Sequence, residues 1–216
     1  MNLQSRTQKI TMIAMLSALA FVIMAIGRIP FMSIPGLTLK YDPKDIVIIT
    51  GGFLYGPVAA ACISVLVSFI EMITVSDNGP WGMLMNIVSS CSFAVTAAVI
   101  YKYKRTLAGA VIGLVSGVLL TAFMMVLWNY LVTPLYLGIP RAVVSPLLMS
   151  FFLPFNLIKG GINAAATMII YKPVAKVLRT MSGMPESAGD GKLNIAAIIT
   201  AAAVIVICAI IVLLIN

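Results

Sequence analysis

The sequence predicts an all-α protein, a polytopic bundle of membrane helices. Of its 216 residues, 62% are hydrophobic and only 9% are charged. The mean hydropathy of +1.12 is too high for a soluble domain. The apolar residues also gather into long runs, and a bilayer core of about 30 Å requires about 20 such residues per helix. No soluble domain and no convincing internal repeat is evident between these runs.

Seven apolar segments are expected to form the membrane helices. In chain order they are residues 10–26, 46–55, 58–75, 81–100, 107–132, 151–171 and 195–215. The second segment is short and is followed by Gly56-Pro57, so residues 46–75 form either two helices or one kinked helix. Gly51-Gly52 and Gly56-Pro57 favour a break. The prediction is therefore a six-helix body with an appended seventh helix.

Proline and glycine mark the connectors between these segments. Residues 27–45 and 133–150 each hold several prolines and are expected to be irregular, and residues 76–80 form a turn. Residues 182–192 are rich in glycine, serine and acidic residues, which is typical of a flexible linker. We divide the chain into a six-helix membrane domain at 1–180, a linker at 181–194 and an additional transmembrane helix at 195–216.

The formal charge of +8 indicates membrane topology and no nucleic-acid partner, because lysine and arginine gather in the cytoplasmic loops of membrane proteins. With a cytoplasmic N-terminus and two helices in residues 46–75, nine basic residues lie inside and four outside. A single kinked helix with the N-terminus outside satisfies the same tendency, so charge alone leaves both alternatives open. The inside set is Arg6, Lys9, Lys102, Lys104, Arg105, Lys172, Lys176, Arg179 and Lys192, and the outside set is Arg28, Lys40, Lys44 and Arg141.

The chain is not expected to be an enzyme or to hold a metal or cofactor. It has no histidine, its three cysteines are isolated in apolar runs, and no G-x-x-x-x-G-K-[ST] phosphate loop is present. An ion-coupled secondary carrier is an alternative, but it needs membrane carboxylates, and only Glu71 qualifies. Glu71 is expected to face the outer loop and to pair with Lys40 or Lys44.

An amide and an ammonium group lie within the sixth apolar segment. Asn156 and Lys159 are three residues apart and share one face of a helix, which Asn163 extends by one turn. An ionisable residue at membrane depth is costly and tends to mark a ligand or ion pathway. The structural alternative is that Lys159 extends to the interface while Asn156 bonds a neighbouring helix. Asn86 and Asn129 are further amides within apolar segments.

Three motifs carry a resemblance to a known family. Residues 39–46 (LKYDPKDI), 51–57 (GGFLYGP) and 154–160 (PFNLIKG) resemble the signatures of riboflavin-specific S components. These proteins are the substrate-binding subunits of energy-coupling factor (ECF) vitamin transporters of bacteria. The likeness runs from about residue 7 to 179 in family order, and the final apolar segment departs from the six-helix family body.

The resemblance implies a function. Such a subunit binds riboflavin at the outer face of the plasma membrane and works with a membrane coupling subunit and two cytosolic ATPases. The missing phosphate loop agrees with energy supplied by a partner. An S component for another vitamin is the alternative within the class, and the sequence leaves open the preferred flavin, the affinity and the role of the last helix.

The resemblance also assigns roles to residues. An amide offers both donor and acceptor, and an ammonium offers three donors, which suits the carbonyl oxygens and N–H of the flavin edge. The Pro-rich loop would gate the pocket and bond the ribityl hydroxyls, although Asp42-Pro43 also fits a helix N-cap. On the first helix, the small residues Ala14 and Ala18 would contact the coupling subunit. The predicted substrate-binding residues are Asn156, Lys159, Leu39, Lys40, Tyr41, Asp42, Asn86, Asn129 and Asn163.

Overall fold

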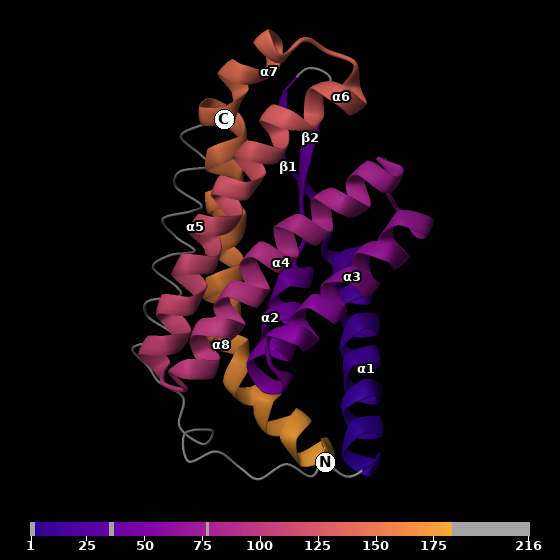
Figure 1. Ribbon diagram of the computed structural model, residues 1–216, viewed down its shortest axis with the longest axis vertical. Coiled ribbons are helices and arrows are strands. Elements are labelled where there is room, and N and C mark those ends of the chain that lie inside the picture. The colour runs from indigo at the N-terminus through magenta and orange to yellow at the C-terminus, as the bar shows by residue number, and fades with distance from the viewer. Residues whose placement is uncertain (1–2, 35–36, 77, 183–216) are drawn as a thin grey trace.

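The protein is a bundle of long helices with a small β-hairpin at one end (Figure 1). The computed structural model describes residues 3–34, 37–76 and 78–182. The predicted seventh helix at 195–215 therefore lies outside the described residues, as does the linker from residue 183 onward. The elements are α1 (Leu3–Gly27), β1 (Ile29–Ile34), β2 (Leu37–Tyr41), α2 (Lys44–Tyr55), α3 (Pro57–Thr74), α4 (Gly79–Tyr103), α5 (Leu107–Leu131), α6 (Thr133–Leu137), α7 (Arg141–Leu147), the π-helix η1 (Leu148–Phe152) and α8 (Leu153–Ser182).

The all-α membrane class is confirmed. Within the described residues, five helical stretches are long and apolar enough to cross a bilayer: Arg6–Gly27, Pro57–Thr74, Gly79–Tyr103, Leu107–Leu131 and Arg141–Tyr171. The remaining helix of the predicted six-helix body is α2, which has 12 residues. It is about 18 Å long, shorter than a bilayer core. Large apolar side chains such as Phe123, which is 62% exposed, cover the outer surface, as expected where lipid is the solvent.

The segment 46–75 forms two helices, and Gly56 separates them. Gly56 has a φ of +94°, a conformation that glycine adopts at no steric cost. Pro57 follows in the first turn of α3, where its missing N–H has no helical partner to lose. The break therefore follows from the Gly-Pro pair, and the two-helix alternative holds.

Helices α4 and α5 pack closely because glycines line their contact. A Cβ atom added at Gly113 would lie 2.8 Å from the carbonyl oxygen of Ala97, and one added at Gly117 would lie 2.7 Å from that of Phe93. Small residues at four-residue spacing allow such backbone approach between membrane helices. Helix α8 packs against α5 of this pair.

Both Pro-rich connectors contain more regular structure than the sequence predicted. Residues 27–45 hold the antiparallel hairpin, which pairs Ile29 with Tyr41 and has an irregular register between Pro30 and Met32. The expectation of an irregular segment at 133–150 is wrong, because α6, α7 and most of η1 lie there. Pro134 lies in the first turn of α6 and Pro140 precedes α7, positions where a missing N–H costs little.

The π-helix η1 joins α7 to α8 without a break in the helical path. The backbone N–H of Leu153, the residue that follows η1, donates to the carbonyl of Leu148, five residues earlier. Pro154 follows at once and has no N–H to donate, so the wider turn lies where a regular helix would lose a bond. One turn later α8 presents Asn156 and Lys159, which makes this irregularity part of the site's surroundings.

Candidate ligand-binding site

A cavity of about 420 Å³ lies among the hairpin, the helices and η1. The hairpin, α6 and α7 lie at the end of the bundle opposite to the start of α1 (Figure 1). The volume is within the range of small-molecule sites. The lining residues come from β2, α3, α4, α5, α6, η1, α8 and the connecting loops: Arg28, Thr38, Leu39, Lys40, Asp42, Glu71, Ser76, Asn78, Gly82, Met85, Asn86, Ser89, Met125, Asn129, Tyr136, Leu137, Phe152, Phe155, Asn156 and Lys159.

Most of the predicted substrate-binding residues line this cavity. The structure brings seven of them together from four parts of the chain: Leu39, Lys40, Asp42, Asn86, Asn129, Asn156 and Lys159. Tyr41 and Asn163 are not among the lining residues. Their side chains instead bond to each other, with Tyr41 Oη donating to Asn163 Oδ1 at 2.8 Å.

Lys159 points into the protein and does not extend to the interface. It is 9% exposed, and its Nζ donates to Asp42 Oδ2 at 3.4 Å. One turn earlier on α8, the Nδ2 of Asn156 donates to the backbone carbonyl of Phe152 at 2.7 Å. That bond fixes the orientation of the amide and leaves Asn156 Oδ1 as an acceptor. The face of α8 toward the cavity therefore combines an acceptor with a cationic donor.

The other two amides in the lining differ in how far the protein satisfies them. Asn129 donates from Nδ2 to the Met125 carbonyl at 2.7 Å and accepts from Thr133 Oγ1 at 2.9 Å, so its acceptor is already in use. Asn86 is buried, and within the described part of the chain its side chain has no hydrogen bond. Asn86 is consequently the more available of the two for a ligand.

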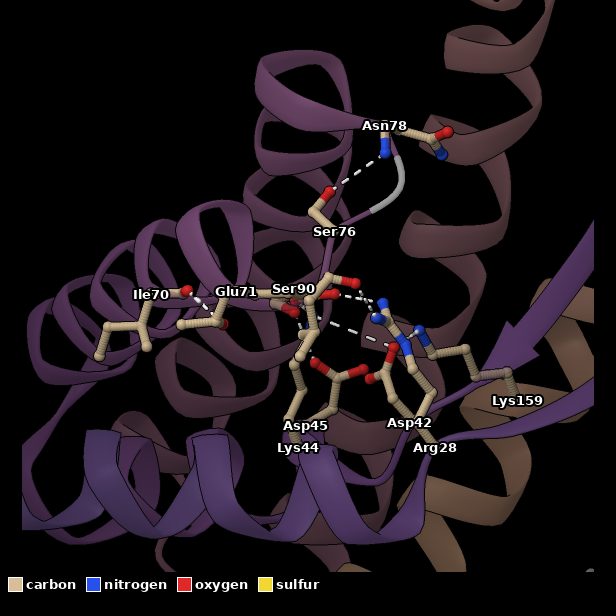
Figure 2. A network of polar contacts seen from close by, with 12 residues as sticks. Arg28, Asp42, Lys44, Asp45, Ile70, Glu71, Ser76, Asn78, Ser90 and Lys159 are labelled. Carbon is tan, nitrogen blue, oxygen red and sulfur yellow. Dashed lines mark hydrogen bonds and ion pairs between the residues drawn. The ribbon is translucent and has the colours of Figure 1, made fainter.

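A chain of ion pairs joins four residues of the cavity lining, Arg28, Asp42, Glu71 and Lys159, and is completed by Lys44 (Figure 2). Glu71 accepts from Arg28 through Oε1 and from Lys44 through Oε2, the latter at 2.5 Å. Lys44 lies 4.0 Å from Asp42, which also pairs with Lys159. The predicted contact of Glu71 with Lys44 is present. Arg28, which the sequence placed only among the outer cations, was missed as a member of this site.

The N-cap interpretation of Asp42 is wrong. Helix α2 begins at Lys44, Pro43 precedes it, and no side chain caps it. The Asp42 carboxylate points to Lys159 instead. Burial alone would raise the pKa of Asp42, but the positive charges of Lys159, Lys44 and Arg28 outweigh burial and hold that pKa below its usual value. Asp42 is therefore ionised at neutral pH.

Two buried polar atoms of the ionic chain lack a protein partner. Among the described residues, neither Asp42 Oδ1 nor Arg28 Nε has a hydrogen bond, and both residues line the cavity. Buried polar groups are nearly always paired, so these two atoms are exceptions, and each belongs to a residue that lines the cavity.

A second polar chain lies beside the first but uses mainly neutral groups. Tyr41 donates to Asn163, Asn163 Nδ2 donates to Asp45 Oδ2 at 3.3 Å, and Ser90 Oγ donates to Asp45 Oδ1 at 2.6 Å. Burial raises the pKa of Tyr41 to about 12, so its phenol remains protonated and able to donate. None of the four residues lines the cavity.

The predicted partner-interface residues lie on the outer surface of the bundle. Ala14 and Ala18 are exposed on α1, whereas Leu16 and Ala20 on the same helix are buried in the core. The outward face therefore contains small residues one turn apart, a pattern that permits close approach of another membrane helix.

Comparison with known proteins identifies relatives. Residues 8–171 match the family described as "ECF transporter, substrate-specific component". The chain is 31% identical over 186 residues to the riboflavin transporter RibU of Staphylococcus aureus, covering 83% of this chain and 96% of that protein. It is 25% identical to the riboflavin transporter FmnP of Bacillus subtilis, over 77% and 91% of the two chains. A solved structure of the S component of a bacterial ECF transporter is 29% identical, with a TM-score of 0.67, and covers 81% of this chain and 99% of that one.

Proposed function

Because this chain belongs to the family of substrate-specific components of ECF transporters, we propose that its cavity binds riboflavin for import across the bacterial plasma membrane. The cavity would open to the outside, and the N-terminus would be cytoplasmic. Residues 1–180 would form the substrate-binding domain, with 195–216 as an additional transmembrane helix. The ligand is transported cargo, and the proposal includes no cofactor.

The observation that carries this proposal is the cavity wall formed by α8 and η1. Asn156 supplies an acceptor through Oδ1, and Lys159 supplies a donor one turn away. The pyrimidine edge of the flavin ring has an N–H between two carbonyl oxygens, which such a pair complements. Phe152 and Phe155 lie in the same wall and offer apolar surface to the ring.

The ribityl chain would lie along the ionic side of the cavity. Its hydroxyl groups both donate and accept, which suits the unpaired Asp42 Oδ1 and Arg28 Nε. In the ionic chain, Arg28, Lys44 and Lys159 face the carboxylates of Asp42 and Glu71, and Asp45 of the second polar chain is near enough to interact with Lys159 and Lys44. A neutral polyol satisfies these groups without adding an unpaired charge to a low-dielectric site.

A proton- or ion-coupled carrier fits these contacts less well. Glu71 is the membrane carboxylate that such a mechanism would use, and it is buried between Arg28 and Lys44. Both oxygens of this carboxylate already accept from cations of the protein, which leaves neither of them open to a transported ion. The energy for import would come from a membrane coupling subunit and two cytosolic ATPases, with Ala14 and Ala18 on the face that meets the coupling subunit.

The test is flavin binding by the purified full-length chain. Riboflavin added to the detergent-solubilised protein should be quenched in fluorescence and should saturate at one molecule per chain, and flavin absorption should accompany protein expressed in rich medium. Colourless protein that fails to quench riboflavin would reject the proposal. A second vitamin that saturates the site while riboflavin does not would favour the alternative ligand.

A further inference from the structure

The β-hairpin contributes to the cavity wall but is attached to the helices mainly through side chains. Its sheet has two strands that pair with each other, and Leu39 and Lys40 of β2 line the cavity. Asp42 follows the strand directly. The backbone ladder joins β2 to β1 alone, so side-chain contacts must set the position of β2 against the helices.

Apolar contacts attach both strands. Met32 of β1 belongs to a buried cluster formed with Val144, Leu148, Phe151, Phe152 and Phe155, against which Phe31 of β1 and Leu39 of β2 also pack. The ring of Phe31 lies 6.2 Å from that of Phe155. Such packing is strong but non-directional, so it fixes the depth of the hairpin better than the exact position of β2. A directional attachment of β2 is also present.

Tyr41, the last residue of β2, makes that attachment through Asn163 of α8. Asn163 is fully buried and uses both ends of its amide: Oδ1 accepts from Tyr41, and Nδ2 donates to Asp45. Ser90 donates to the other oxygen of Asp45, so three helices fix the orientation of the Asn163 amide. Its acceptor is thereby presented to the phenol, and β2 is tied to α2, α4 and α8 at once.

We infer that Tyr41 and Asn163 are positioning residues that pin β2 to α8 and thereby hold Leu39, Lys40 and Asp42 in the cavity wall. The pin acts on the hairpin rather than on the ligand, because neither residue lines the cavity. Its effect on riboflavin rests on the function proposed above. Its effect on the hairpin does not depend on any ligand.

The first experiment measures hydrogen–deuterium exchange of the hairpin in ligand-free, detergent-solubilised full-length protein. Tyr41→Phe removes one hydroxyl group and keeps the ring. We expect backbone amides of Ile29–Ile34 and Leu37–Tyr41 to exchange roughly five- to tenfold faster, as for the loss of one hydrogen bond with a buried partner. The matched control is Tyr103→Phe, since Tyr103 is 82% exposed at the end of α4 and should change nothing.

A double-mutant cycle tests whether the two residues act through one bond. Asn163→Leu should accelerate hairpin exchange as Tyr41→Phe does, and the double variant should add little to either change. If the increases in hairpin exchange rate of the two single variants multiply in the double variant, the Tyr41–Asn163 bond is not what pins β2. Unchanged hairpin exchange in Tyr41→Phe would overturn the inference outright, and this variant keeps the test informative if Asn163→Leu folds poorly.

The second experiment follows riboflavin release by the same variants, using the return of flavin fluorescence after dilution. Tyr41→Phe should release riboflavin roughly five- to tenfold faster than wild type. Faster hairpin exchange with unchanged release would overturn the claim that the pin holds the cavity wall. If wild type failed to bind riboflavin while hairpin exchange still responded, the proposed ligand would be rejected and the pin supported.

Discussion

Replacing Lys159 by methionine removes the ammonium group from the cavity and keeps most of the side-chain volume. The Nζ of Lys159 is the cationic donor that we assign to the flavin edge, and it pairs with Asp42 at 3.4 Å. The substitution therefore has two consequences. The ligand loses a donor, and Asp42 loses the nearer of the two lysines with which it forms ion pairs, with Lys44 remaining at 4.0 Å.

The magnitude of each consequence follows from these contacts. Loss of one hydrogen bond from a charged group costs about 1.5–3 kcal/mol, which is roughly a ten- to hundredfold loss in riboflavin affinity. Breaking a buried ion pair costs about 3–5 kcal/mol where one charge is left alone. The remaining Lys44 reduces that cost for Asp42, so a fall in stability of about 1–3 kcal/mol is expected.

Two measurements separate the consequences. Fluorescence quenching gives the affinity, and thermal unfolding of the ligand-free protein gives the stability. Adding Asp42→Asn to Lys159→Met should restore much of the stability, because the unpaired carboxylate is gone, but it should not restore affinity. Lys102→Met, at an exposed lysine in the last turn of α4, is the matched control and should alter neither. Wild-type affinity in Lys159→Met would refute the assignment of Lys159 to the ligand.

Four further outcomes are expected. Asn156→Leu removes the acceptor from the cavity wall and should weaken riboflavin binding by about 1–3 kcal/mol in quenching titrations. In this variant, methylation of the ring N–H of riboflavin should cause little further loss of affinity. Glu71→Gln leaves two cations without their shared carboxylate and should destabilise the ligand-free protein by about 3 kcal/mol in thermal unfolding. The pKa of Asp42 is lowered on folding, so its stabilising contribution is present above the unfolded pKa and disappears only as pH falls through the lower folded pKa. Between pH 7 and pH 5, the unfolding temperature of the wild type should therefore fall no further than that of Asp42→Asn. Gly117→Val would bring a side chain within 2.7 Å of the Phe93 carbonyl and should separate α4 from α5, which a large fall in unfolding temperature would report.

Within residues 3–182, the sequence predicted the membrane helices well because their signal is local. Each long apolar run is its own evidence for a helix, and Gly56-Pro57 marks the one break inside such a run by backbone conformation alone. Asn156 and Lys159 could also be recognised from the sequence as candidate site residues, since they are polar groups in an apolar helix. Both features can be recognised without knowledge of any distant contact.

Some of what sequence reasoning missed depends on contacts between residues that are far apart in the chain. Arg28 and Glu71 are 43 positions apart, and Tyr41 and Asn163 are 122 apart, so nothing local shows that they meet. Residues 133–150 were expected to be irregular because prolines were counted without regard to where a helix starts. A proline in the first turn costs a helix almost nothing, so its position matters more than its presence.

The two polar chains show how hydrogen-bond saturation distinguishes a ligand contact from a structural one. Tyr41, Asn163, Asp45 and Ser90 form a chain in which both carboxylate oxygens and both ends of the amide are occupied, which leaves these groups little to offer a ligand. In the ionic chain, Asp42 Oδ1 and Arg28 Nε remain unpaired at the cavity.

An unpaired buried acceptor costs about 1–3 kcal/mol, and a folded protein tolerates that cost where a ligand removes it. Hydrogen-bond saturation also ranks the three asparagine side chains that line the cavity. Asn129 already accepts from Thr133, whereas Asn156 Oδ1 and the side chain of Asn86 have no protein partner among the described residues. Replacing Asn86 should therefore weaken riboflavin binding directly, whereas replacing Asn129 should act mainly by releasing α6 from α5.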